Sequence, residues 1–266
     1  MYLQHTAGLA YPVHHKRVVP ESVTAARLTR PAAMLPRRYT MNMPAKPLTD
    51  IFMLSLFLLL MAASHTGSAA HEWLGVLLTV LFVIHTRLNL GWYKSLARGR
   101  YNVTRAVRLL VNALLLLAML GTLASAVLIS RTVFAFLGFK GELAFRTFHV
   151  FCAHWCFLLA AVHFGMYGRR FLSSLERPAA FPRPLGYRLA SCGLGMALAL
   201  YGIHAFRQRE LFFPLTMQSS FMLWSDDAVL FLLDYGAVFF LGSWLTVMIL
   251  SFPHTMKKFA SPFIKK

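Results

Sequence analysis

Histidine closes both ends of two apolar stretches, HEWLGVLLTVLFVIH at residues 71–85 and HVFCAHWCFLLAAVH at residues 149–163. The two histidines of each stretch are therefore fourteen residues apart. Fourteen helical residues turn through about 1400°, about 40° short of four turns, so each pair lies on one helix face. The rise of about 21 Å places the two members of a pair near opposite sides of a hydrocarbon core about 30 Å thick.

The composition around these stretches is that of a membrane protein. Hydrophobic residues make up 58% of the 266 residues and charged residues 14%, whereas soluble domains carry about 25% charged residues. We predict an all-α fold, a polytopic bundle of six transmembrane helices with a haem-binding four-helix core. The predicted spans are 49–66, 71–92, 107–130, 146–168, 187–205 and 228–251.

The net charge of +18 is explained by topology. With the N-terminus inside, 22 of the 27 basic residues fall in cytoplasmic segments, as the positive-inside rule requires. Both termini are then cytoplasmic, and the multi-pass chain is expected in a cytoplasmic membrane, with the basic surplus facing anionic lipid head groups. A nucleic-acid partner is not expected.

Three segments follow from this topology: a disordered basic cytoplasmic tail at 1–48, a transmembrane cytochrome domain at 49–252 and a short basic cytoplasmic tail at 253–266. Residues 1–40 lack hydrophobic periodicity, so Met41 or Met43 is an alternative start. The first span is the weakest of the six, because Asp50 precedes a short apolar core.

The second and fourth spans run in the same direction, which pairs the histidines by depth. His71 then lies level with His149 near the external face, and His85 lies level with His163 toward the cytoplasm. Neutral imidazole is a good haem ligand, so the two pairs predict the axial ligands of two stacked haems. None of the three cysteines forms a C-x-x-C-H attachment motif, which indicates non-covalent, b-type haems. Six-coordinate iron favours electron transfer over oxygen chemistry.

Other residues are candidates for contact with these haems. Gly75 offers room one turn from His71. Small residues follow the same side of the fourth span, and they predict either a porphyrin groove or ordinary close helix packing: Cys152, Ala153, Cys156 and Ala160. Basic residues at the two ends would pair with haem propionates, Arg87, Arg105 and Arg108 inside and Arg146 or Arg131 outside. Positive-inside anchoring is the alternative for the inner three.

Five further polar residues have open roles. His65 competes with His71 as an external ligand, and His154 points away from the ligand face and is expected to bond a neighbouring carbonyl. His204 is a structural or substrate contact near the external face. Glu72 and Asp234 are either proton or quinol ligands or ordinary polar contacts.

These residues resemble a family of bacterial membrane proteins called flavinylation-associated cytochromes, over roughly residues 49–250. The resemblance is carried by HEWLG at 71–75, HTRLN at 85–89, SRTVF at 130–134, the stretch 149–163, and YGIHAF at 201–206 with LDY at 233–235. It implies a di-haem electron conduit and a partner, an extracytoplasmic flavoprotein that carries covalent FMN.

The resulting hypothesis is a relay that passes electrons across the membrane, from quinol or a cytoplasmic donor to an external acceptor protein. One alternative is a reductase of a small external acceptor, such as ferric iron or quinone, with a pocket around His204, Arg207 and Arg209. The other is a haem-free metal or proton transporter, which the repeated spacing disfavours, because one ion needs ligands within a few ångströms of each other.

Overall fold

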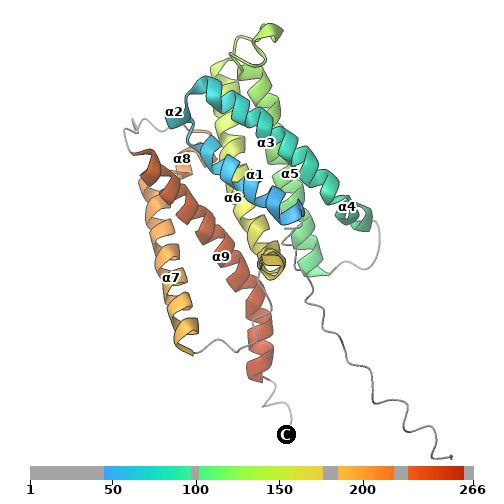
Figure 1. Ribbon diagram of the computed structural model, residues 1–266, viewed down its shortest axis with the longest axis vertical. Coiled ribbons are helices and arrows are strands. Elements are labelled where there is room, and N and C mark those ends of the chain that lie inside the picture. The colour runs from blue at the N-terminus through green and yellow to red at the C-terminus, as the bar shows by residue number, and fades with distance from the viewer. Residues whose placement is uncertain (1–44, 97–101, 176–184, 219–226, 261–266) are drawn as a thin grey trace, which may run out of the picture. The chain divides into compact units, whose positions relative to one another are not determined.

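The computed structural model describes residues 45–96, 102–175, 185–218 and 227–260, and every regular element there is a helix (Figure 1). The helices are α1 (Ala45–Met61), α2 (Ala63–Thr66), α3 (Ser68–Leu88), α4 (Leu90–Leu96), α5 (Val103–Ile129), the 3-10 helix η3 (Ala135–Leu137), α6 (Leu143–Leu175), α7 (Leu185–Gln208), α8 (Phe212–Leu215) and α9 (Ala228–Ala260). The all-α prediction is confirmed. Residues 1–44 of the predicted tail at 1–48, and residues 261–266 of the predicted tail at 253–266, lie outside the described residues.

Four helical segments in the described part of the chain are long and apolar enough to cross a membrane: Ser68–Leu88, Val103–Ile129, Leu143–Gly168 and Ala228–Ser251. They support a lipid bilayer as the environment. The other two predicted spans correspond to α1 and α7. Helix α1 has 17 residues and is therefore about 26 Å long, shorter than the hydrocarbon core. Glycine, serine and arginine between residues 186 and 195 lower the hydropathy of α7.

One face of α3 is suited to lipid. Trp73, Leu77, Val80 and Ile84 are exposed, and their spacing of three or four residues puts them along one stripe of the helix. Leu78, on the other side, is buried. Helix α5 repeats this pattern with the exposed residues Val107, Leu110, Leu114 and Leu117. Apolar side chains that face outward in this way are expected of helices surrounded by lipid.

Glycine sets the closest helix contacts in the bundle, which join α5 to α6, α6 to α9 and α7 to α9 (Figure 1). A β carbon placed on Gly121, Gly165 or Gly202 would lie 2.8 Å from Cys152 Sγ, 2.5 Å from the Ser243 carbonyl oxygen and 2.6 Å from the Ala237 carbonyl oxygen, respectively. Small residues bring membrane helices together in this way. Helix α3 instead packs on α1 and makes at most isolated close backbone contacts with α5 and α6.

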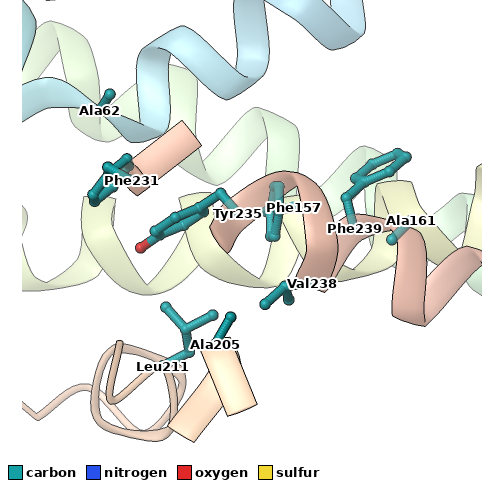
Figure 2. Close-up of a cluster of buried hydrophobic side chains, with 9 residues drawn as sticks. All are labelled: Ala62, Phe157, Ala161, Ala205, Leu211, Phe231, Tyr235, Val238 and Phe239. Atoms are coloured by element: carbon teal, nitrogen blue, oxygen red, sulfur yellow. The ribbon is translucent and has the colours of Figure 1, made fainter. Parts of the chain in front are cut away.

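Two apolar clusters hold the bundle. Figure 2 shows the first, in which Phe157 of α6 lies among Tyr235, Val238 and Phe239 of α9. The ring centre of Phe157 is 5.4 Å from that of Tyr235 and 5.8 Å from that of Phe239. The second cluster joins α1, α3, α5 and α6 through Leu56, Leu78, Met119 and Cys156. We call this second cluster the central apolar layer.

Candidate functional site

His71 of α3 and His149 of α6, which we call the outer pair, meet between these two helices. The ring centres of His71 and His149 are 6.3 Å apart, and the ring planes are inclined by 76°. Gly67 makes the corner before α3 with a φ of +78°, a backbone conformation that glycine adopts without steric cost. The amide of His71 donates to the Gly67 carbonyl at 3.0 Å, so this corner fixes where the first turn of α3 holds the ring.

The distance between these two rings fits two imidazoles on opposite sides of one metal ion. A transition metal binds an imidazole nitrogen at about 2 Å, and the ring centre lies roughly 1 Å behind that nitrogen. Two opposed ligands therefore have ring centres about 6 Å apart, close to the 6.3 Å between His71 and His149. The same distance and inclination are also those of an edge-to-face pair of aromatic rings, so the bonds made by the Nδ1 atoms are needed to distinguish the two arrangements.

Helix α5 holds the His149 ring. Its Nδ1 lies 3.0 Å from the Thr122 carbonyl oxygen and 3.1 Å from Ser125 Oγ. The Ser125 hydroxyl donates to the Gly121 carbonyl at 2.7 Å, so its oxygen can accept from the imidazole. Nδ1 of His149 therefore carries the proton and donates to α5. Nε2 is left with a free lone pair, as a metal ligand requires.

The inner pair is anchored in the same way. Nδ1 of His163 lies 2.8 Å from Asn112 Oδ1 on α5, and Nδ1 of His85 lies 2.7 Å from Asp50 Oδ1 on α1. The Asn89 amide donates to the His85 carbonyl at 2.9 Å and comes only within 3.5 Å of Nε2. His85 and His163 are close enough for charge on one ring to act on the other, although the described residues show no ring contact between them like that of the outer pair.

Buried polar atoms without partners add a second indication. Among the described residues these are Nδ1 of His71, Oγ1 of Thr86 and Nε of Arg108. The first belongs to the proposed ligand His71. Thr86 follows the proposed ligand His85 on α3, and Arg108 lies on α5 one turn from Asn112, which bonds His163. The Leu60 carbonyl, in the last turn of α1, is near enough to interact with the His71 ring. Buried polar groups are otherwise nearly always paired, so these atoms fit a site that takes a polar or charged group.

The described residues contain no group of three His, Cys, Asp or Glu side chains that converge as a metal site. Haem iron needs only two protein ligands, because the porphyrin supplies the other four. The donor set therefore fits haem: paired imidazoles, Nδ1 atoms anchored on neighbouring helices, and unpartnered donors at the inner end for propionates.

The central apolar layer separates the two pairs. Leu78 is seven residues from both His71 and His85, and Cys156 is seven residues from both His149 and His163. Both are buried, and the Cys156 thiol lies 3.9 Å from Met119 Sδ. The layer lies about 10 Å along each helix from either pair, so the two sites are distinct.

The residues predicted to line the haems fall in different places. A β carbon on Gly75 would meet nothing within 4 Å, so α3 has room there. Arg87 is exposed near the end of α3, and Arg146 donates from Nε to the Gly141 carbonyl at 3.1 Å. Cys152 does not line an open groove for a porphyrin, because its Sγ packs against Gly121 of α5. For this position the alternative of ordinary close helix packing is correct.

Glu72 has a clear structural role. Its carboxylate accepts bonds from the Ser130 hydroxyl at 2.7 Å and from the backbone amides of Arg131, Thr132 and Val133 at 2.8, 3.0 and 2.8 Å. These groups form a turn directly after α5 that surrounds the carboxylate with donors. Glu72 thus ties the start of α3, next to His71, to the end of α5.

Asp234 is also engaged. Nε and Nη2 of Arg209 each lie 2.8 Å from its Oδ2, and the Tyr201 hydroxyl donates to its Oδ1 at 2.5 Å. Arg209 and Asp234 are each 4% exposed, so this ion pair is buried and joins α7 to α9. Arg209 is therefore not part of an open external pocket with His204, which is exposed.

The remaining predictions about histidine and cysteine can be compared directly. His154 bonds the Val150 carbonyl at 2.8 Å, as predicted, and also lies 3.3 Å from the Tyr235 hydroxyl. His65 lies against the Phe231 ring at 5.2 Å. All three cysteines are free; Cys152 and Cys156 are buried and Cys192 is exposed.

Sequence reasoning missed the groups that hold the imidazoles. Asn112 and Ser125 are polar residues inside the apolar run of α5, and they are thirteen residues apart, which matches the depth difference of the histidines on α6. Asp50 lies at the start of α1, and an up-and-down topology places it level with His85. The expected depth of each polar side chain in the membrane is the sequence signal that could have identified these residues.

Comparison with family models, with curated proteins and with solved structures gives no match for this chain.

Proposed function

We propose that this chain is a transmembrane cytochrome that holds two b-type haems between α3 and α6. His71 and His149 would bind the outer iron, and His85 and His163 the inner iron. Bound haem supplies one-electron redox chemistry. The protein supplies axial ligands, a low-dielectric surrounding and charges at the two ends of the bundle.

The observation that carries this proposal is the arrangement of the imidazoles. His71 and His149 face each other at 6.3 Å, a distance that suits one metal ion between them. For three of the four histidines, Nδ1 is bonded to an acceptor on a neighbouring helix. Such a second bond fixes the tautomer and aims Nε2 at the metal. Ordinary buried histidines need one partner but no matched pairing at two depths.

In this proposal all six long helices cross the membrane, and both termini lie in the cytoplasm of a bacterial cell. The distribution of basic residues supports this orientation. His71 and His149 then lie on the outer side. Electrons from quinol or a cytoplasmic donor would enter at the inner pair and leave toward an extracytoplasmic acceptor. The resemblance to flavinylation-associated cytochromes suggests that this acceptor is a flavoprotein with covalent FMN.

The alternative of a small-acceptor reductase has less support. It requires an external basic pocket around His204, Arg207 and Arg209, and Arg209 is instead buried against Asp234. A haem-free transporter of metal ions requires converging ligands, which the described residues do not bring together in groups of three. The reductase would share both haems and differ only by a substrate site, whereas a haem-free transporter does not account for histidines matched at two depths.

The test is haem content in detergent-purified protein. We expect about two non-covalent haems per chain with b-type bands. His149→Ala removes an outer ligand and His85→Ala an inner ligand, so each should lower the content to about one haem. His204→Ala, at an exposed histidine outside both pairs, is the matched control and should keep both haems. Full haem content in both ligand variants would refute the assignment.

A further inference from the structure

The four imidazoles differ in what their Nδ1 atoms meet. Nδ1 of His149 meets a backbone carbonyl and a hydroxyl, and Nδ1 of His163 meets the neutral amide oxygen of Asn112. Nδ1 of His85 alone meets a carboxylate, Asp50 Oδ1, at 2.7 Å. The two sites are therefore not equivalent, and the inner one contains a direct imidazole–carboxylate pair.

The position of Asp50 is not explained by solvation alone. A carboxylate near a bilayer core is costly unless it is paired, and Asp50 lies in the second turn of a helix that packs on α3. Its side chain is 34% exposed and that of His85 is 27% exposed. Both side chains are therefore partly shielded from water. A charged acceptor roughly doubles the strength of a hydrogen bond, so the bond between His85 and Asp50 is expected to be strong.

We propose that Asp50 is a positioning residue that sets the reduction potential of the inner centre and makes it the lower of the two. This inference rests on the proposed function. A carboxylate that accepts a hydrogen bond from Nδ1–H makes the imidazole a stronger donor to the metal. The oxidised iron carries one more positive charge than the reduced iron, and a nearby negative charge stabilises it. Both effects lower the reduction potential.

The other charges near the two sites do not cancel this difference. The Arg108 guanidinium lies 5.8 Å from the centre of the Tyr167 ring, and the centre of that ring lies 4.8 Å from that of the His163 ring. Arg87, two residues from His85, is exposed, so solvent screens its charge. Glu72 is adjacent to His71, but its carboxylate is surrounded by four donors that face it. Asp50 is the carboxylate that bonds a ligand ring directly.

This order of potentials favours outward electron flow. An electron that arrives at the inner centre moves downhill to the outer centre, across the central apolar layer. The direction in which electrons enter and leave the proposed relay would then be set by one carboxylate on α1, although all four ligands are histidines.

The experiment is redox potentiometry of the purified haem-loaded protein, followed in the visible spectrum. Asp50→Asn keeps the size and the hydrogen-bond acceptor but removes the charge. We expect two midpoints in the wild type, of which Asp50→Asn raises the lower and leaves the higher in place. Asp227→Asn is the matched control, because it makes the same change at an exposed carboxylate that caps α9 through the Val229 amide; both midpoints should stay unchanged.

Two results would overturn the inference: no shift of either midpoint in Asp50→Asn, or a shift confined to the higher midpoint. If Asp50→Asn does not fold, Asp50→Glu replaces it. The longer side chain keeps the charge but displaces it from Nδ1, so the lower midpoint should rise part of the way, and an unchanged value would again overturn the inference. A wild-type protein without haem would instead refute the proposed function, so the two failures are distinguishable.

Discussion

Replacement of Glu72 gives a graded loss of stability that can be worked out from its four bonds. Glu72→Ala removes the acceptor for all four donors. The Ser130 hydroxyl and the Val133 amide are partly buried, whereas the amides of Arg131 and Thr132 are exposed to solvent. An unpaired buried donor costs about 1–3 kcal/mol. Because water replaces the bonds of the two exposed amides, the two partly buried donors set the cost, and we expect a destabilisation of about 2–6 kcal/mol in total.

Glu72→Gln should cost less. The donors divide unequally, because Ser130, Thr132 and Val133 meet Oε2 and only Arg131 meets Oε1. The amide oxygen of glutamine can keep the first three bonds and lose the fourth, an exposed bond worth about 0.5–1.5 kcal/mol.

The assay is equilibrium unfolding in mixed detergent micelles, followed by circular dichroism, with the exposed Glu142→Gln in the same external segment as the control. Haem content is measured on the same samples, since loss of the Glu72 anchor should release His71 and lower occupancy of the outer site first. Wild-type stability in Glu72→Ala would refute this account of the carboxylate. Equal losses in the alanine and glutamine variants would refute the division of its bonds.

Three further predictions concern the inner site and the bundle. Asn112→Leu removes the acceptor of His163 and should lower metal-site affinity about 10–100-fold, measured as haem lost to apomyoglobin over time. Asp234→Ala removes the carboxylate that pairs with the buried Arg209 guanidinium and should destabilise the fold by about 3–5 kcal/mol, measured by unfolding in micelles. Gly165→Ala places a methyl group against the α9 backbone and should cost about 1–3 kcal/mol through overpacking, in the same assay.

Each of these three has its own control. Asn112→Asp keeps the acceptor oxygen and should retain haem better than the leucine variant. The double variant Arg209→Leu/Asp234→Leu removes both charges. It should recover most of the stability, because the charge that stays buried in Asp234→Ala is the main penalty in that variant. Gly193→Ala, where an added β carbon meets nothing within 4 Å, should be neutral or stabilising. If any control variant lost as much haem or stability as the variant it is compared with, the role given to the corresponding contact would be contradicted.

The helical fold was accessible from the sequence because long apolar runs have few alternatives. In lipid, every backbone polar group must be bonded internally, so an apolar stretch of about 20 residues forms a helix. The marginal elements were the ones with weak signals. Helix α1 has only 17 residues and carries Asp50 in its second turn, and α7 is rich in glycine, so neither is among the four candidate spans.

The pairing of His71 with His149 was accessible for the same reason, because helical periodicity and antiparallel packing fix face and depth. The partners of the imidazoles were not accessible. A backbone carbonyl such as that of Thr122 has no sequence signature, and Asp50 is separated from His85 by 35 positions. Ionisable residues within membrane spans are often functional, and this suggested a role in proton or quinol binding for Glu72 and Asp234. Each is instead bonded to groups that only the tertiary structure brings together.

The most direct test of the central claim is the reduced-minus-oxidised visible spectrum of the full-length protein, purified in detergent from haem-replete cells, with haem quantified per chain. We expect sharp b-type bands and about two haems per chain, held by bis-histidine ligation. A folded but colourless protein would contradict the claim.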